Sequence, residues 1–135
     1  MHHFEAVRSH VGSLHALRQS DPYLISFDLD LPQGRRQGMY LAELEDDAGY
    51  RYLRISTPIC PLAGTDPQRC LRFNWEQRCG YLAVADLDGE PYLHLCENRP
   101  YRLLDEGELR RVIVELGRLA GELGRLVAGG RCRRR

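Results

Sequence analysis

Apolar residues recur along this chain with two different periods, and this feature limits its possible folds more than any other. From Phe4 to Leu17 they are spaced by three or four positions, which predicts a helix with one apolar face. From Tyr23 to Thr57 they alternate with polar residues, which predicts strands. The helical spacing returns from Leu109 to Val127. Strands bracketed by helices in this way predict a two-layer α+β domain.

The alternating region contains three predicted strands in a row. Two short turns, at Pro32–Arg36 and Asp46–Gly49, separate the strands Tyr23–Leu31, Gly38–Glu45 and Tyr50–Thr57. Because these turns are short, neighbouring strands run in opposite directions and form an antiparallel meander.

Helix-start signals appear twice more. Asp66 followed by Pro67 predicts the start of a short helix that ends at about Gln77. Asp105 and Glu108 have the spacing of a capping box at the start of the last helix.

Two further strands, Gly80–Asp86 and Glu90–Cys96, flank the hairpin signal Asp88-Gly89, and Glu97–Leu104 is predicted as a loop. The expected order is therefore α-β-β-β-α-β-β-α. We expect an antiparallel five-stranded sheet packed against helices, in a single domain of residues 1–128.

Charge is unevenly distributed along the chain. The predicted flexible tail, residues 129–135, holds Arg131, Arg133, Arg134 and Arg135, and without these four the chain has 15 arginines against 19 acidic residues. A mildly acidic body is a poor nucleic-acid surface, so we expect no nucleic-acid partner. Cys132, among these arginines, is predicted to be the most reactive thiol.

The chain has no run of about 18 apolar residues and no secretory signal pattern at its start, so we expect no membrane partner and a cytoplasmic location. The cysteines, at 60, 70, 79, 96 and 132, form no Cys-x-x-Cys pair. In that location they are expected to be reduced.

No residue cluster predicts catalysis or metal binding. Asp28 and Asp30 are typical of a solvated strand face, and Asp86 and Asp88 belong to the hairpin turn. His94 and Cys96 share a strand face, but two ligands do not make a zinc site. We expect no enzyme activity, no metal and no cofactor.

Two other patterns leave alternatives open. Tyr50 and Tyr52 lie opposite the aliphatic face of their strand. They bind a partner, cover a second packed face or form a dimer contact. Gly117 and Gly121 lie one turn apart on the last helix. They make a helix–helix or partner contact, allow tight packing over the sheet, or reflect composition alone.

Several segments in this order resemble the class I type III secretion chaperones (Tir-chaperone-like) and the related YbjN-type putative sensory-transduction regulators. The segments are Tyr52–Pro58, Leu71–Trp75, Gly80–Ala85, the Asp86–Glu90 hairpin and the capped helix from Asp105.

This resemblance implies a homodimer that holds an extended segment of another protein, without ATP or covalent chemistry. A secreted effector is one candidate partner. The alternative is a YbjN-type regulator or small-ligand sensor, which predicts an enclosed pocket and no extended groove.

The resemblance also implies sites. We expect the dimer interface at Leu71 and Trp75 of the middle helix. The predicted partner-binding residues come from the first helix and the tyrosine face: Val7, Val11, Leu14, Tyr50 and Tyr52.

Overall fold

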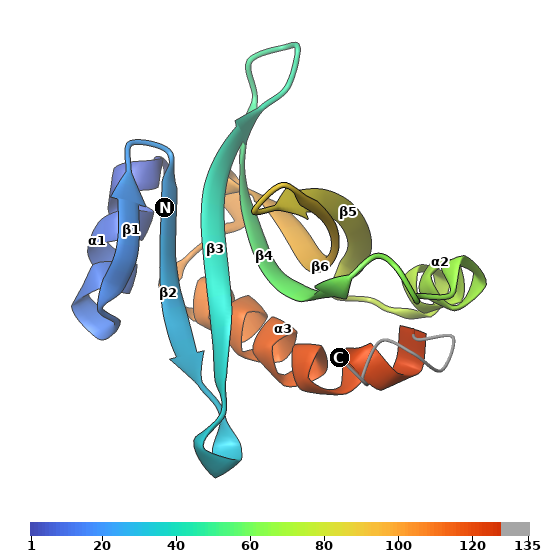
Figure 1. Cartoon of the computed structure of the whole chain (residues 1–135). Coiled ribbons are helices and arrows are strands. Elements are labelled where there is room, and N and C mark those ends of the chain that lie inside the picture. The colour runs from blue at the N-terminus through green and yellow to red at the C-terminus, as the bar shows by residue number, and fades with distance from the viewer. Residues whose placement is uncertain (128–135) are drawn as a thin grey trace.

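An antiparallel sheet is the centre of the fold, and helices cover one of its faces (Figure 1). The computed structural model describes residues 1–127, so the predicted basic tail and Cys132 lie outside the described residues. The helices are α1 (Phe4–Leu14), α2 (Pro67–Glu76) and α3 (Glu106–Val127). The strands are β1 (Leu17–Asp21), β2 (Leu24–Asp30), β3 (Arg36–Glu45), β4 (Arg51–Pro61), β5 (Tyr81–Leu87) and β6 (Glu90–Pro100).

The six strands lie in the order β1-β2-β3-β4-β6-β5, and every neighbouring pair is antiparallel. The α+β class and the antiparallel sheet are as predicted. The strand count and the element order are not, because the sheet has six strands and the order is α-β-β-β-β-α-β-β-α.

The additional strand is β1, where the sequence predicts the end of a helix and a turn. Helix α1 ends at Leu14, and His15 already has an extended backbone. Strand β1 is almost entirely exposed and pairs with β2 across a bulge after Leu17. Backbone pairing with β2 therefore holds this strand in place. Since its side chains are exposed, they need not alternate between apolar and polar.

Strands β4 and β6 are longer than predicted. β4 continues through Pro58 to Pro61, with a bulge between Pro58 and Cys60 where proline offers no donor to the ladder. β6 continues to Pro100 through residues predicted as loop. The two strands pair along their whole length, and each extends the other.

The core lies between one sheet face and helices α1 and α3. The sheet contributes alternate residues with almost no exposure, and the helices contribute their apolar stripes. These buried residues include Ile25, Phe27, Met39, Leu41, Leu53, Ile55 and Leu95 from the sheet, and Val7, Val11, Leu109, Val112, Leu116 and Leu123 from the helices.

Both predicted N-caps are present. The Asp66 carboxylate accepts from the Gln68 amide at 3.0 Å, and the Asp105 carboxylate accepts from the Glu108 amide at 2.7 Å. Glu108 pairs with Arg99 and Arg111, which joins the first turn of α3 to β6.

Helix α2 lies at the free edge of β5 and covers neither sheet face (Figure 1). The Asn74 side chain accepts from the Leu82 amide at 2.7 Å and donates to the Leu82 carbonyl at 3.3 Å. These two bonds occupy backbone groups that an edge strand would otherwise expose.

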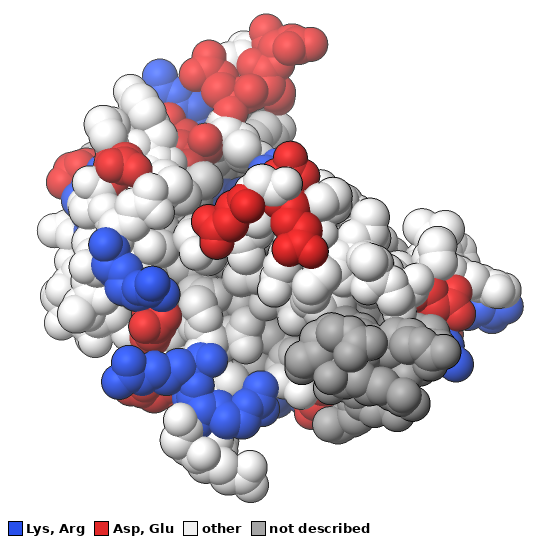
Figure 2. All heavy atoms as spheres, viewed as in Figure 1, with Lys and Arg blue, Asp and Glu red and all other residues white. Residues whose placement is uncertain are grey.

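In the described part of the chain, no helix covers the second face of the sheet (Figure 1). The register places Tyr40, Tyr52, Tyr81 and Tyr92 on this face. In Figure 2, an acidic cluster stands in the middle of the view, and further charged side chains lie toward the edges.

Candidate functional site

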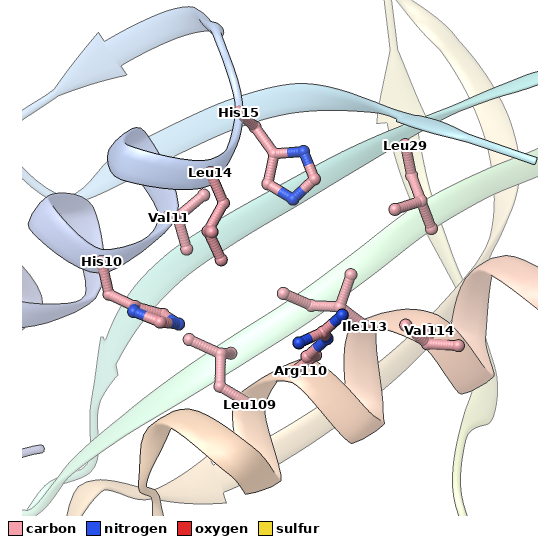
Figure 3. Close-up of a pocket in the computed structure, with 9 residues that line it drawn as sticks. All are labelled: His10, Val11, Leu14, His15, Leu29, Leu109, Arg110, Ile113 and Val114. Carbon is pink, nitrogen blue, oxygen red and sulfur yellow. The ribbon is translucent and has the colours of Figure 1, made fainter.

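A groove of about 290 Å³ lies between α1 and α3, above the end of β2 (Figure 3). Helix α1 and the residue after it form one wall, α3 forms the other, and Leu29 of β2 closes one end. The lining residues are His10, Val11, Leu14, His15, Leu29, Leu109, Arg110, Ile113 and Val114.

The apolar lining has a buried floor and an exposed rim. Val11 and Leu109 belong to the core and are 2% and 1% exposed. Leu14 and Val114 stand on opposite walls and are 58% and 52% exposed. Two large aliphatic side chains thus face solvent across one hollow, where a covering chain would bury them.

The polar lining residues are all basic or imidazole groups, because no carboxylate lines the groove. Arg110 makes no ion pair with any described residue, whereas its neighbour Arg111 pairs with Glu108 at 2.8 Å. His10 lies 3.4 Å from Glu106, measured from Nδ1 to Oε2.

His15 lies at the end of the groove nearest β2. Its ring stacks on Phe27 with 4.3 Å between ring centroids. Burial lowers the pKa of His15 below 6.5, and the nearby negative charge of Asp30 opposes this shift in part. The neutral imidazole of His15 therefore predominates at neutral pH.

A second exposed apolar surface lies on α2. Leu71 is 69% exposed and Trp75 is 89% exposed, and none of the residues of α2 is buried. Both side chains line a shallow hollow together with Gln68, Arg72 and Glu76. An exposed tryptophan one turn from an exposed leucine is typical of an interface.

The two predicted tyrosines differ in exposure. Tyr50 lies just before β4 and is 64% exposed, while Tyr52 is partly buried and its hydroxyl donates to Asp46 at 3.3 Å. Both line a shallow hollow with Tyr101 and Arg102, and no residue of this hollow lines the α1–α3 groove.

The predicted partner-binding residues of α1 have different positions. Val7 is 0% exposed and Val11 is 2% exposed, since both pack against the sheet. Only Leu14 presents a large surface to solvent. Val7 therefore has no surface for a partner while this fold is intact.

The pattern alone did not single out Leu29, Arg110 and Val114, which complete the groove. Val114 gives the clearest signal, because it is a β-branched apolar residue outside the apolar stripe of α3. Arg110 gives no sequence signal, since only the fold places it in the lining of the groove.

The paired carboxylates make ordinary ion pairs. Asp28 lies 3.1 Å from Arg18, and Asp30 lies 3.6 Å from Arg36. Both aspartates line one hollow together with these two arginines, so each carboxylate has a cation beside it.

His94 and Cys96 interact with residues of the strands beside β6. His94 Nε2 lies 3.1 Å from the Ala85 carbonyl. Burial raises the pKa of the Cys96 thiol to about 11, and Arg54 opposes this shift. Across residues 1–127, no group of three or more potential ligands is placed to hold a metal ion.

The described cysteines differ in oxidation state. Cys70, Cys79 and Cys96 are free thiols, whereas Cys60 is disulfide-bonded. The expectation that all the cysteines are reduced is therefore wrong at Cys60.

The glycines of α3 allow tight packing within the chain. A Cβ atom at Gly117 would overlap Leu29, and one at Gly121 would lie 2.6 Å from the Arg35 guanidinium. Side chains of β2 and of the β2–β3 turn already occupy this stripe, which favours packing within the chain over a partner contact.

Comparisons with known proteins give no relative from which to transfer a function: no family model, no curated protein and no solved structure matches this chain. Among residues 1–127, no helix has the length and apolar character needed to span a membrane.

Proposed function

We propose that this chain is a non-enzymatic, chaperone-like domain that holds a partner polypeptide and acts as a homodimer. The observation that carries the proposal is the presence of two separate exposed apolar surfaces, the α1–α3 groove and the outer side of α2. Neither surface is needed for the core, and each exposes two large apolar side chains.

The outer side of α2 is the proposed dimer interface. Leu71 and Trp75 project from a helix at the end of the molecule, so a second copy can approach without disturbing the sheet. An isologous contact brings the same two residues from each copy together.

The α1–α3 groove is the proposed polypeptide site. It is open to solvent along Leu14 and Val114, and a chain can lie across it from either side. This openness supports a polypeptide partner over the alternative of a small-ligand sensor, which predicts an enclosed pocket.

The dimer is tested by analytical ultracentrifugation at about 100 μM, a concentration suited to micromolar self-association. We expect a dimer for the wild type and a monomer for Leu71→Arg and Trp75→Arg, with unchanged circular dichroism. Leu103→Arg is the matched control, because Leu103 is 63% exposed but lies outside α2. A monomeric wild type would contradict the dimer.

Polypeptide holding is tested with reduced, carboxymethylated α-lactalbumin, which stays unfolded. We expect the wild type and Leu103→Asp to bind it, and Leu14→Asp to bind at least about tenfold more weakly, since a buried charge excludes an apolar contact. Equal binding by Leu14→Asp would exclude the groove as the site.

A further inference from the structure

We infer that the α1–α3 groove selects an amphipathic segment that places carboxylates beside its apolar residues. This inference rests on the proposed function, because it names the chemistry of the partner at the same site. It goes beyond that function in predicting the sign of charge that the partner carries.

The first argument is the charge of the lining. Arg110, His10 and His15 supply every polar side chain of the groove, and no acidic residue lines it. This contrasts with the remaining body, where acidic residues outnumber arginines when the tail is set aside. An acidic segment is therefore attracted to the groove, while the rest of the body carries a net negative charge.

The second argument is that Arg110 makes no ion pair within residues 1–127, although a glutamate has a favourable spacing for one. Glu106 lies four residues before Arg110 on α3, the favourable spacing for an ion pair within a helix. Glu106 instead lies beside His10 of α1. By contrast, Arg111 and Arg118 each pair with a glutamate three residues earlier.

The third argument is position. Figure 3 shows the Arg110 guanidinium on the α3 wall, between Leu109 and Val114 and across the groove from His15. An apolar side chain that enters between Leu14 and Val114 therefore brings its neighbouring residues close to a guanidinium. A carboxylate there can accept two parallel hydrogen bonds from Arg110.

The experiment uses three labelled peptides of equal length and helical propensity. One combines leucine with glutamate, the second combines leucine with lysine, and the third combines serine with glutamate. Fluorescence anisotropy measures the Kd of each for the wild type and for Arg110→Glu, Val114→Asp and Arg111→Glu. Val114 and both arginines are exposed, and thermal unfolding checks that each variant is folded.

For the wild type, we expect the leucine–glutamate peptide to bind at least about tenfold more tightly than either other peptide. Val114→Asp abolishes this binding. Arg110→Glu reverses the preference toward the leucine–lysine peptide. Arg111→Glu changes Kd by less than about twofold, because it alters the same net charge on the same helix away from the groove.

Several results would overturn the inference. If the groove binds peptides equally well whatever their charge, the acidic partner is refuted but the proposed function is not. Displacement of the peptide by dodecanoate at lower concentration than by unlabelled peptide would assign the groove to a small carboxylate ligand. Loss of the dimer in Val114→Asp would assign it to a second copy of the chain. Absence of groove-dependent binding by any peptide would refute the proposed function as well.

Discussion

Helices α2 and α3 begin in the same way but have opposite surroundings. Each begins at an aspartate cap, and each places apolar residues along one side. The apolar side of α3 is buried, with Leu109 1% and Leu116 0% exposed. On α2, by contrast, Leu71 and Trp75 are among the most exposed large apolar residues described.

An apolar side favours contact of a helix with another surface. The sequence of the helix does not specify which surface that is. Helix α3 follows β6 and lies back across the sheet, so the sheet covers it. Helix α2 connects β4 to β5 at the sheet edge, where Cys70 and Phe73 contact the core and the opposite side stays open. The three predictions below test this contrast, from the largest effect to the smallest.

The largest effect is expected where α3 meets the sheet. Leu116→Ala should lower the free energy of unfolding by about 3 to 4 kcal/mol, because it removes buried contacts and leaves a cavity. Leu71→Ala, the matched change in α2, should alter the monomer by less than about 0.5 kcal/mol. Urea unfolding followed by circular dichroism, at concentrations where the monomer predominates, measures both. Equal losses of free energy of unfolding would show that the two residues contribute equally to the stability of the monomer.

A smaller effect is expected at Gly80, which leads from α2 into β5. Its φ is +99°, and a Cβ atom there would lie 3.0 Å from Leu95 and 3.2 Å from Leu116. Gly80→Ala should cost about 2 to 3 kcal/mol, from backbone strain and overpacking together.

Gly89 separates these two causes. Its φ is +81°, but no atom lies within 4 Å of an added Cβ. Gly89→Ala should therefore cost only about 1 kcal/mol, the strain alone. If both variants lose the same free energy of unfolding, the contacts of the added Cβ at Gly80 do not contribute to the loss.

The smallest effect depends on pH and concerns the first turn of α3. Hydrogen bonding to Arg111, and then to Arg99, lowers the pKa of Glu108 from 4.5 to about 2. Because the folded state lowers this pKa, the stabilisation is complete above about pH 4.5 and is lost as pH falls toward 2. Wild type should thus exceed Glu108→Gln in stability at pH 6, and the difference should shrink steadily below pH 4.5.

The control for this titration is Glu76→Gln in α2, where Glu76 makes no ion pair with any described residue. Its difference from wild type should be small and constant over the same range. Acid unfolding monitored by circular dichroism gives both curves. A constant difference for Glu108→Gln would show that its ion pairs do not stabilise α3.

Much of the fold could be predicted, because its signals are local. The alternation around Ile25, Phe27, Leu53 and Ile55 identified the strands and their buried face correctly. The Asp88-Gly89 turn has positive φ at both residues, which its sequence predicts. Strand β1 was missed because an exposed edge strand needs no alternation; the backbone of β2 orders it.

The groove was predicted only in part, for the same reason. Leu14 was identified from the apolar spacing of α1, but that spacing also selected Val7, which the sheet buries completely. Arg110 and Val114 belong to the groove because α3 crosses close to α1, and this contact joins residues about 100 positions apart.

The sequence by itself determined the class of the fold, the helix caps and the hairpin turn. All of these depend on residues a few positions apart, whose spacing and side-chain chemistry act locally. Only the tertiary structure decided the sixth strand, the burial of Val7 and the place of Arg110 in the groove. Each of these depends on what a distant segment covers or leaves open, and the spacing of residues along a chain does not contain that information.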